Sequence, residues 1–186
     1  MVGNFKFARV DLTFKFQIAI SSVTKHAYLS LGSNLGNRSQ NIHAALKMLS
    51  EAGIQIEAVS SFYKTEPVDF RPQPWFVNCV AKVITELMPL QLLKAAQRVE
   101  RALGRRNGVP RGPRPIDIDI LLYENAIVRS LALTIPHPRM SERRFVLLPL
   151  RELAQQLRHP VTQRTVLEML NETQDSSRVL KMPEEC

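Results

Sequence analysis

The sequence has few of the features that mark secreted, membrane-embedded or cysteine-rich proteins. Only two cysteines occur, Cys79 and Cys186, which excludes a disulfide framework and a cysteine-based metal site and predicts a reducing compartment, the cytoplasm. Cys79 lies in an apolar run and is expected to be a small buried residue. No apolar run reaches the roughly 18 residues that a membrane span needs. Lys6 and Arg9 interrupt any signal-peptide core, so neither membrane insertion nor secretion is expected.

The charge of the chain favours an anionic partner. Lys and Arg number 25 against 17 Asp and Glu, which gives a formal net charge of +8. Nucleic acid, an acidic membrane surface and a phosphorylated small molecule all fit this balance, and composition does not choose among them. The 186 residues, 45% of them hydrophobic, predict one domain with a substantial core.

The periodicity of apolar residues predicts a mixed α/β (α+β) fold. Alternation indicates strands and helical spacing indicates helices, in the order β-α-β-β-α-β over residues 26–34, 37–53, 54–65, 75–85, 89–104 and 115–123. This is the order of a ferredoxin-like sandwich, here with an added hairpin and C-terminal helices over residues 125–136, 141–154 and 165–170. The two long helices are expected to cover one sheet face, which leaves the other face for solvent or a ligand.

Three regions are expected along the chain. Residues 26–170 form the folded domain. Residues 1–25 form an N-terminal extension of open role, with strand-like alternation from Val10 to Ile20. Residues 171–186 are polar and are expected to form a frayed C-terminal tail.

Two carboxylates share one face of the strand in "GPRPIDIDILLYEN", residues 112–125. Strand residues alternate between faces, so the Cα atoms of Asp117 and Asp119 should lie about 6.5–7 Å apart, with the neighbouring isoleucines facing the core. The two carboxylates repel each other, and each raises the pKa of the other. A cation is therefore expected between them, either arginine or Mg²⁺, which takes carboxylates together with water and substrate phosphates. The alternative is the solvated outer face of an amphipathic strand.

Arginines crowd the segment before this strand. Between residues 98 and 114 the only acid is Glu100, and the arginines are Arg98, Arg101, Arg105, Arg106, Arg111 and Arg114. The first two could be the solvated face of a helix. The other four lie on a Gly- and Pro-rich loop, from which guanidinium groups can close over a metal-bound polyphosphate. No GxxxxGK[ST] loop or protein-kinase signature set occurs, so those nucleotide enzymes are excluded.

The motif "RGPRPIDIDILLYEN" closely resembles the signature of the 6-hydroxymethyl-7,8-dihydropterin pyrophosphokinases, a family of folate-pathway enzymes. Further blocks resemble the same family in the same order: "AYLSLGSNLGNR", "SSFYKTEPV", "WFVNCV", "QRVERALGR" and "TIPHPRMSERRFVLLPL". The similarity covers roughly residues 26–170. It implies that ATP gives its terminal two phosphates, as one unit, to the pterin hydroxymethyl group and that AMP is released. It also implies two Mg²⁺ ions held by Asp117 and Asp119.

The resemblance implies a role for each matching residue. The catalytic positions are Arg105, Arg114, Asp117 and Asp119, and the ATP-side positions are Gln97, Glu100, His137 and Arg143. The pterin-side positions are Thr65, Glu66, Val68, Phe76, Asn78 and Phe145. Asn78 also stands out by itself, because a mid-strand asparagine among apolar residues must satisfy its amide.

Alternatives remain for several of these residues. Glu100 could be a helix-surface charge, His137 a turn residue, and the two phenylalanines core residues. Two positions depart from the family pattern. Arg111 stands where an aromatic residue often covers the pterin, and Ala132 stands where some members have a nucleotide-contacting arginine.

Two other functions compete with this interpretation. An RRM-like RNA-binding module has the same element order and a basic charge, but it needs exposed aromatics in a strand signature that is missing here. A metal-dependent nuclease would need a third acidic ligand and a water-activating base, and neither is evident. The expected partners are therefore ATP and the pterin, with no nucleic acid and no membrane, and the expected state is a monomer. The loop from Arg105 to Arg111 is expected to close over the substrates.

Overall fold

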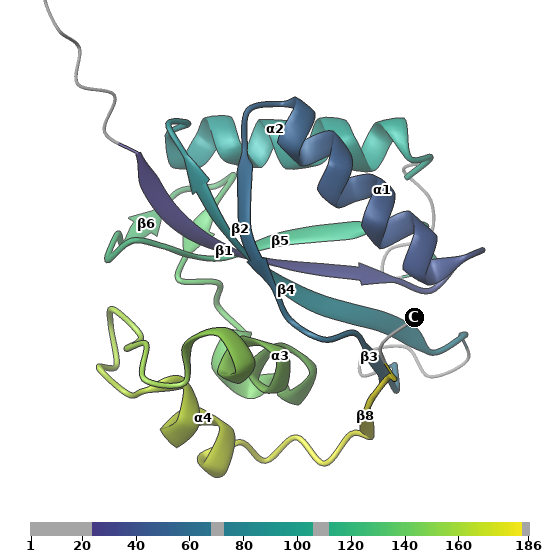
Figure 1. Cartoon of the computed structure of the whole chain (residues 1–186). Coiled ribbons are helices and arrows are strands. Elements are labelled where there is room, and N and C mark those ends of the chain that lie inside the picture. Colours follow the sequence, from purple (N-terminus) through teal and green to yellow (C-terminus); the bar gives the residue numbers. More distant parts are fainter. Residues whose placement is uncertain (1–23, 68–72, 106–111, 184–186) are drawn as a thin grey trace, which may run out of the picture.

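Figure 1 shows the computed structural model of the chain, which describes residues 24–67, 73–105 and 112–183. One antiparallel sheet forms its centre. Its middle strands are β1 (Lys25–Ser33) and β4 (Phe76–Thr85), which pair along their whole lengths. The other strands of this sheet are β2 (Gln55–Val59), β3 (Tyr63–Thr65), β5 (Asp117–Tyr123) and β8 (Val179–Lys181). The expected mixed α/β fold with an antiparallel sheet and C-terminal helices is therefore confirmed.

The sheet is larger than the β-α-β-β-α-β unit that periodicity predicts. The run 54–65, expected to be one strand, divides into β2 and β3, and each pairs with a different half of β4. Ser60 lies at the division, where its hydroxyl accepts a hydrogen bond from the backbone N–H of Val80 (3.0 Å). A side chain that takes a ladder donor competes with regular pairing, so the strand is interrupted there.

The helices lie on both faces of the sheet (Figure 1). On one face are α1 (Arg38–Glu51) and α2 (Pro89–Ala102), and on the other are α3 (Arg144–Ala154) and α4 (Val166–Glu172). The smaller elements are β6 (Val128–Arg129), β7 (Thr134–Ile135) and the 3-10 turn η1 (Met140–Glu142). The second face was expected to carry solvent or a ligand, but α3 and α4 cover part of it.

Two apolar clusters stabilise these layers. The larger lies beneath α1 and α2 and includes Ile116, Ile118 and Ile120, as their alternation predicts. Cys79 is fully buried in the same cluster, which confirms the prediction of a small buried residue, and burial raises the pKa of its thiol. The smaller cluster joins the opposite face to α3 and α4. Among the residues that the structure describes, no helix is long and apolar enough to cross a membrane.

The C-terminal segment differs from its prediction. Instead of a frayed tail after Asn171, the chain completes α4 and then runs back to form β8, which pairs with β3. Its partner lies more than 100 residues earlier in the sequence, so local periodicity carries no signal of the pairing. The N-terminal extension lies outside the described residues up to position 23.

Candidate active site

A cavity of about 230 Å³ opens on the sheet face that α3 and α4 leave uncovered. The strand positions that line its floor are Ser30 and Gly32 on β1, Phe76 and Asn78 on β4, and Asp117 and Asp119 on β5. The walls come from the start of α3, the loop after β7 and the segment after β3. Alternation along three adjacent strands therefore brings polar side chains from distant parts of the sequence to one surface.

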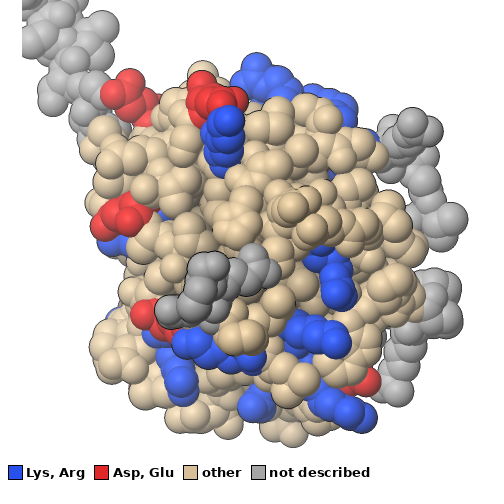
Figure 2. Space-filling model, turned by 45° about the vertical axis from the view of Figure 1, so that its right-hand side comes forward, with Lys and Arg blue, Asp and Glu red and all other residues tan. Residues whose placement is uncertain are grey.

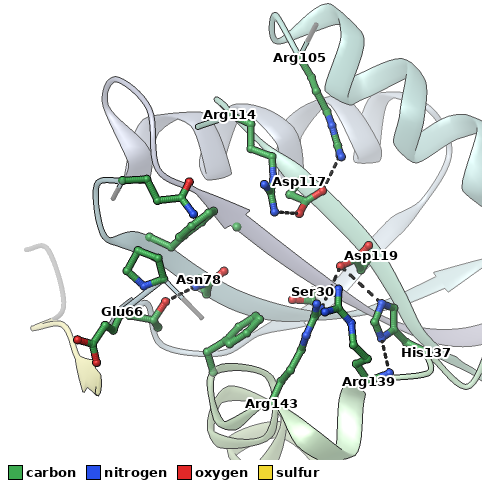
Figure 3. A pocket seen from close by; sticks show the side chains of 16 residues that line it. Ser30, Glu66, Asn78, Arg105, Arg114, Asp117, Asp119, His137, Arg139 and Arg143 are labelled. Atoms are coloured by element: carbon green, nitrogen blue, oxygen red, sulfur yellow. Dashed lines mark hydrogen bonds and ion pairs between the residues drawn. The ribbon is translucent and has the colours of Figure 1, made fainter. Parts of the chain in front are cut away.

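Asp117 is the meeting point of two arginines (Figure 3). Arg105 Nη1 donates to its Oδ1 at 2.5 Å, and Arg114 Nη2 donates to its Oδ2 at 2.6 Å. Charge-assisted hydrogen bonds of this kind are about twice as strong as neutral ones. The prediction of a cation at the acidic pair is confirmed for Asp117, and the cations are guanidinium groups.

Asp119 has a different environment, although it lies on the same face of β5. Two side chains approach it from the loop after β7 and the start of α3 (Figure 3): His137 Nε2 and Arg143 Nη1 each lie 3.9 Å from its Oδ2. Its enclosed position, and then the negative charge of Asp117, raise the pKa of Asp119 to about 6. Asp119 is thus a carboxylate with a strong demand for positive charge.

His137 faces this carboxylate as a neutral ring. Burial, followed by the charges of Arg143 and Arg139, lowers the pKa of His137 to about 4. Its Nδ1 accepts the backbone N–H of Arg139 at 3.2 Å, so the ring proton of the neutral form lies on Nε2, toward Asp119. The ring can therefore donate one hydrogen bond into the cavity at neutral pH.

The other end of the cavity holds a buried amide and two aromatic rings. Asn78 is 4% exposed, and its Nδ2 donates to the Thr65 hydroxyl at 2.6 Å. Its Oδ1 packs so closely on Gly32 that a Cβ there would lie 2.4 Å away. Phe76 and Phe145 both line the cavity, and each ring lies beneath a guanidinium, of Arg114 at 5.2 Å and of Arg143 at 5.4 Å. This end therefore offers polar groups that can form hydrogen bonds with the edge of a flat ligand, and aromatic rings that can pack against its faces.

Residues 28–155 match the model of the family described as 7,8-dihydro-6-hydroxymethylpterin-pyrophosphokinase (HPPK). The chain belongs to this family. A Haemophilus influenzae 2-amino-4-hydroxy-6-hydroxymethyldihydropteridine pyrophosphokinase is 42% identical over 158 residues, which are 84% of this chain and 98% of that protein. The Schizosaccharomyces pombe folic acid synthesis protein fol1 is 45% identical over 152 residues, or 81% of this chain. The chain spans only 21% of fol1, and 18% of its Pneumocystis carinii counterpart.

The fold of this chain is similar to that of solved HPPK structures. A Plasmodium falciparum HPPK-DHPS crystal structure superposes with a TM-score of 0.66 over 83% of this chain and 46% of its own, at 17% sequence identity. At that identity the likeness concerns the fold alone. None of these comparisons supports the alternative of an RNA-binding module.

Two of the residues matched to the ATP side of HPPK lie away from the cavity. Glu100 is buried behind β5, where its Oε1 accepts the backbone N–H of Ile118 at 2.8 Å and also bonds Arg105. Burial is the main cause that raises the pKa of Glu100. Glu100 therefore fixes the β5 backbone between Asp117 and Asp119, and it also holds Arg105. The alternative that Glu100 is a helix-surface charge is wrong. Gln97, one turn earlier, is exposed and does not line the cavity.

Of the other predicted site residues, some line the cavity and some lie outside the residues that the structure describes. Thr65, Glu66, His137 and Arg143 all line it. Val68 and Arg111 lie outside the described residues, as does the loop 106–111 that was expected to close. Ala132 is exposed on the turn between β6 and β7.

Four residues that lie at or next to this cavity were not identified from the sequence. Arg139 and Gln73 line the cavity, and each lies in a block that already resembled the family or adjoined one. Asn34 is 2% exposed, and its Oδ1 accepts the backbone N–H of Arg114 at 2.8 Å. Ser30 stands beside Asp119 in the β1–β5 register. Ser30 and Asn34 lie in the family-like block "AYLSLGSNLGNR", but their contacts with β5 and Arg114 follow only from strand pairing and loop packing, which the sequence does not display.

The acidic pair fits a magnesium site. Among the described residues, no group of three or more His, Cys, Asp or Glu side chains is arranged to hold a metal ion by itself. Mg²⁺ usually takes only one or two carboxylates and completes its shell with water and substrate phosphates. Asp117 and Asp119 both face the cavity, and a bound cation would offset the burial and the like charge that raise the pKa of Asp119.

Proposed function

We propose that this chain transfers the terminal two phosphates of ATP, as one unit, to the hydroxymethyl group of 6-hydroxymethyl-7,8-dihydropterin and releases AMP. The observation that carries the proposal is the two-ended cavity. One end has paired carboxylates beside several arginines, and the other has a buried amide and two aromatic rings. Names of the relatives supply the reaction and the substrates, and the cavity has the chemistry to bind both substrates.

The nucleotide end is built for a polyphosphate. Four arginines line the cavity: Arg105, Arg114, Arg139 and Arg143. Fixed cations around a phosphate chain stabilise the charge that develops during transfer, and they need no reorganisation at that moment. Arg105 and Arg114 rest on Asp117, so their N–H groups are already at the place where phosphate oxygens would compete for them.

Asp117 and Asp119 would hold Mg²⁺, which when bound would neutralise phosphate charge and orient the chain. Asn34 fixes the backbone that carries Arg114, and Glu100 fixes Arg105 together with the β5 backbone. Through these contacts Glu100 would serve the nucleotide end without touching ATP. His137 would donate its Nε2–H toward the phosphates. A contact of Gln97 with the nucleotide stays a prediction.

The pterin end would bind a flat heterocycle by its edge and its faces. The ring offers alternating donors and acceptors, which Asn78, Thr65 and the backbone at Glu66 can match, while Phe76 and Phe145 supply apolar faces. Val68, outside the described residues, stays a predicted contact.

The reaction would need orientation more than a strong base. The hydroxymethyl oxygen forms a bond to the β-phosphorus, the bond from that phosphorus to the oxygen shared with the α-phosphate breaks, and AMP departs with that oxygen. The hydroxyl proton passes to water as the new bond forms. Holding the two reactants in line can supply much of the rate enhancement, on the order of 7–11 kcal/mol in well-oriented systems.

We also propose that the protein is active as a monomer and works in a reducing compartment, the cytoplasm; the small number of cysteines, two in 186 residues, supports the second of these proposals.

The decisive experiment is product analysis. The protein is incubated with ATP, Mg²⁺ and 6-hydroxymethyl-7,8-dihydropterin, and nucleotides are separated by chromatography. AMP and the pterin diphosphate should appear in equal amounts, and neither should form without the pterin. Formation of ADP in place of AMP, or no reaction with this pterin, would overturn the proposal.

A further inference from the structure

The segment after α4 runs back across the molecule and ends as β8 beside β3 (Figure 1). There β8 pairs antiparallel with β3 in a register that sets Thr65 opposite Val179 and Tyr63 opposite Lys181. Backbone hydrogen bonds extend the pairing beyond both ends. The Glu66 N–H donates to the Arg178 carbonyl at 3.0 Å, and the Met182 N–H donates to the Phe62 carbonyl at 2.8 Å.

This pairing bears directly on the cavity wall. β3 is only three residues long, ends at Thr65 and is followed directly by Glu66 and Pro67. All three of these residues line the cavity. Thr65 in turn accepts the Asn78 amide. Without β8, β3 would be a short edge strand paired on one side only, and such strands open readily.

Side chains fasten the same junction. The Arg178 backbone N–H lies 3.3 Å from the Glu66 carboxylate and donates to it. Glu152 on α3 accepts from Lys181 Nζ, from the Tyr63 hydroxyl and from the Ser61 N–H, each at 2.7 Å. Helix α3, β3 and β8 are thereby joined through a single carboxylate.

We propose that β8 is a positioning element for the pterin end of the site. It holds Thr65 and Glu66 where Asn78 and the substrate need them, and it has no part in the nucleotide end. Asp117 and Asp119 lie on β5, which β1 and β4 separate from β3 in the sheet. This inference rests on the proposed pterin substrate, and it assigns a specific role to a segment that lies beyond the family match at residue 155.

Leu180 provides a matched pair of variants. It pairs with Lys64, and it is 52% exposed, so its side chain contributes little packing. Leu180→Pro removes the backbone N–H and blocks strand pairing. Leu180→Ala removes the same exposed side chain and retains the pairing, so it serves as the control.

Both variants are compared with the wild-type chain by calorimetry. One titration follows a non-hydrolysable ATP analogue with Mg²⁺, and a second follows the pterin in the presence of that complex. If the Thr65–Pro67 segment is correctly placed about a tenth of the time without β8, the pterin Kd rises about tenfold in Leu180→Pro. Analogue binding should stay unchanged, as should both affinities in Leu180→Ala. Hydrogen exchange of the Glu66 amide should be faster in Leu180→Pro alone.

The outcomes separate this inference from the proposed function. If wild-type protein binds the analogue but no pterin, the proposed substrate is wrong. If wild type binds pterin and Leu180→Pro binds it equally well, the role of β8 is wrong. Equal loss of pterin and nucleotide binding would also overturn the inference, because it would make β8 a general stabilising element. Should Leu180→Pro fail to fold, a chain that ends at Ser177 is tested by the same criteria.

Discussion

Asp117 and Asp119 look equivalent as residues, but they meet different surroundings. Asp117 accepts hydrogen bonds from two guanidinium groups, whereas His137 Nε2 and Arg143 Nη1 lie 3.9 Å from the carboxylate of Asp119. Removing one partner of a charge pair leaves the other partner uncompensated, and that loss dominates the cost. The two carboxylates should therefore be equally important for activity and unequal in their effect on the fold.

We expect Asp117→Asn and Asp119→Asn each to abolish AMP formation and to leave a folded protein. Asp117→Asn should lower Tm in metal-free buffer more than Asp119→Asn does, because Arg105 and Arg114 then lose their shared counter-charge. Thermal melts in EDTA, read beside product analysis, check both statements. Measurable turnover in either variant would contradict the proposal that both carboxylates hold magnesium. Equal Tm changes would contradict the inferred difference in how the two carboxylates stabilise the fold.

Gly32 is required by close contact rather than by backbone conformation. A Cβ at Gly32 would lie 2.4 Å from Asn78 Oδ1, which must move. Gly32→Ala should raise the pterin KM about tenfold, equivalent to one lost hydrogen bond of about 1.4 kcal/mol, and leave the ATP KM unchanged. Gly53→Ala is the control, because Gly53 has a positive φ of 81° but no atom within 4 Å of its added Cβ. A pterin KM unaffected in Gly32→Ala would show that Asn78 does not position the pterin.

At the level of elements, the site depends on how helices meet strand edges. Helix α2 presents Glu100 to the outer edge of β5, and α3 presents Glu152 to the junction of β3 and β8. Glu100 accepts the backbone N–H of Ile118, and Glu152 accepts the backbone N–H of Ser61. Each carboxylate thus satisfies a backbone donor at a strand edge. The same two contacts place the nucleotide end and the pterin end of the cavity.

Glu100→Ala should lower the free energy of unfolding by about 1–3 kcal/mol, the usual cost of a buried donor left unsatisfied. It should also reduce kcat, since Arg105 loses one of its two anchors. Denaturant unfolding and steady-state kinetics measure the two effects. Glu51→Ala, at an exposed position on α1, is the control and should change neither. Wild-type stability in Glu100→Ala would mean that the Ile118 N–H has another partner.

Glu152 should make the junction of α3, β3 and β8 sensitive to acid. Burial acts to raise the pKa of Glu152, but hydrogen bonds from Lys181, Tyr63 and Ser61 outweigh it and hold the pKa at about 2, below the ordinary 4.5. A carboxyl with a depressed pKa in the folded state stabilises the fold above 4.5 and loses that effect as pH falls toward 2. Glu152→Gln should therefore lower Tm at pH 7, and the difference from wild type should shrink between pH 4.5 and 2. A difference independent of pH would contradict this.

At the scale of the whole molecule, positive charge is spread beyond the cavity. Figure 2 shows Lys and Arg side chains gathered over the lower half of one face, at the level of α3 and α4, with few acids among them. Exposed arginines on and near these helices include Arg144, Arg151, Arg158 and Arg164. Such a field attracts polyphosphates from solution, while the cavity supplies the selectivity.

Binding of nucleotide should depend on a divalent cation. With Mg²⁺, a non-hydrolysable ATP analogue at a hundred times its Kd should stabilise the protein by about 2.7 kcal/mol, seen as a rise in Tm. In EDTA the rise should largely disappear, because Asp119 then repels the phosphates. The Asp119→Asn variant should no longer distinguish the two conditions. An equal rise in EDTA and in Mg²⁺ would show that arginines alone hold the nucleotide.

Much of the fold and of the site follows from the sequence alone. Alternation placed Asp117 and Asp119 on one face of a strand and the three isoleucines on the other, because strand geometry follows from local sequence. The division of 54–65 at Ser60 and the strand β8 were not inferred. Both depend on hydrogen bonds to distant segments, which local patterns do not encode.

Local order along the chain thus determined the elements, the family motifs and the residue types available for phosphate and pterin chemistry. Tertiary structure alone decided that Arg105 and Arg114 share Asp117, that Glu100 supports β5 from behind the cavity, and that the C-terminal segment braces the opposite end. The physical reason is that partner choice among charges and strand edges depends on distances in space, and these exist only once the sheet and its helices have packed together.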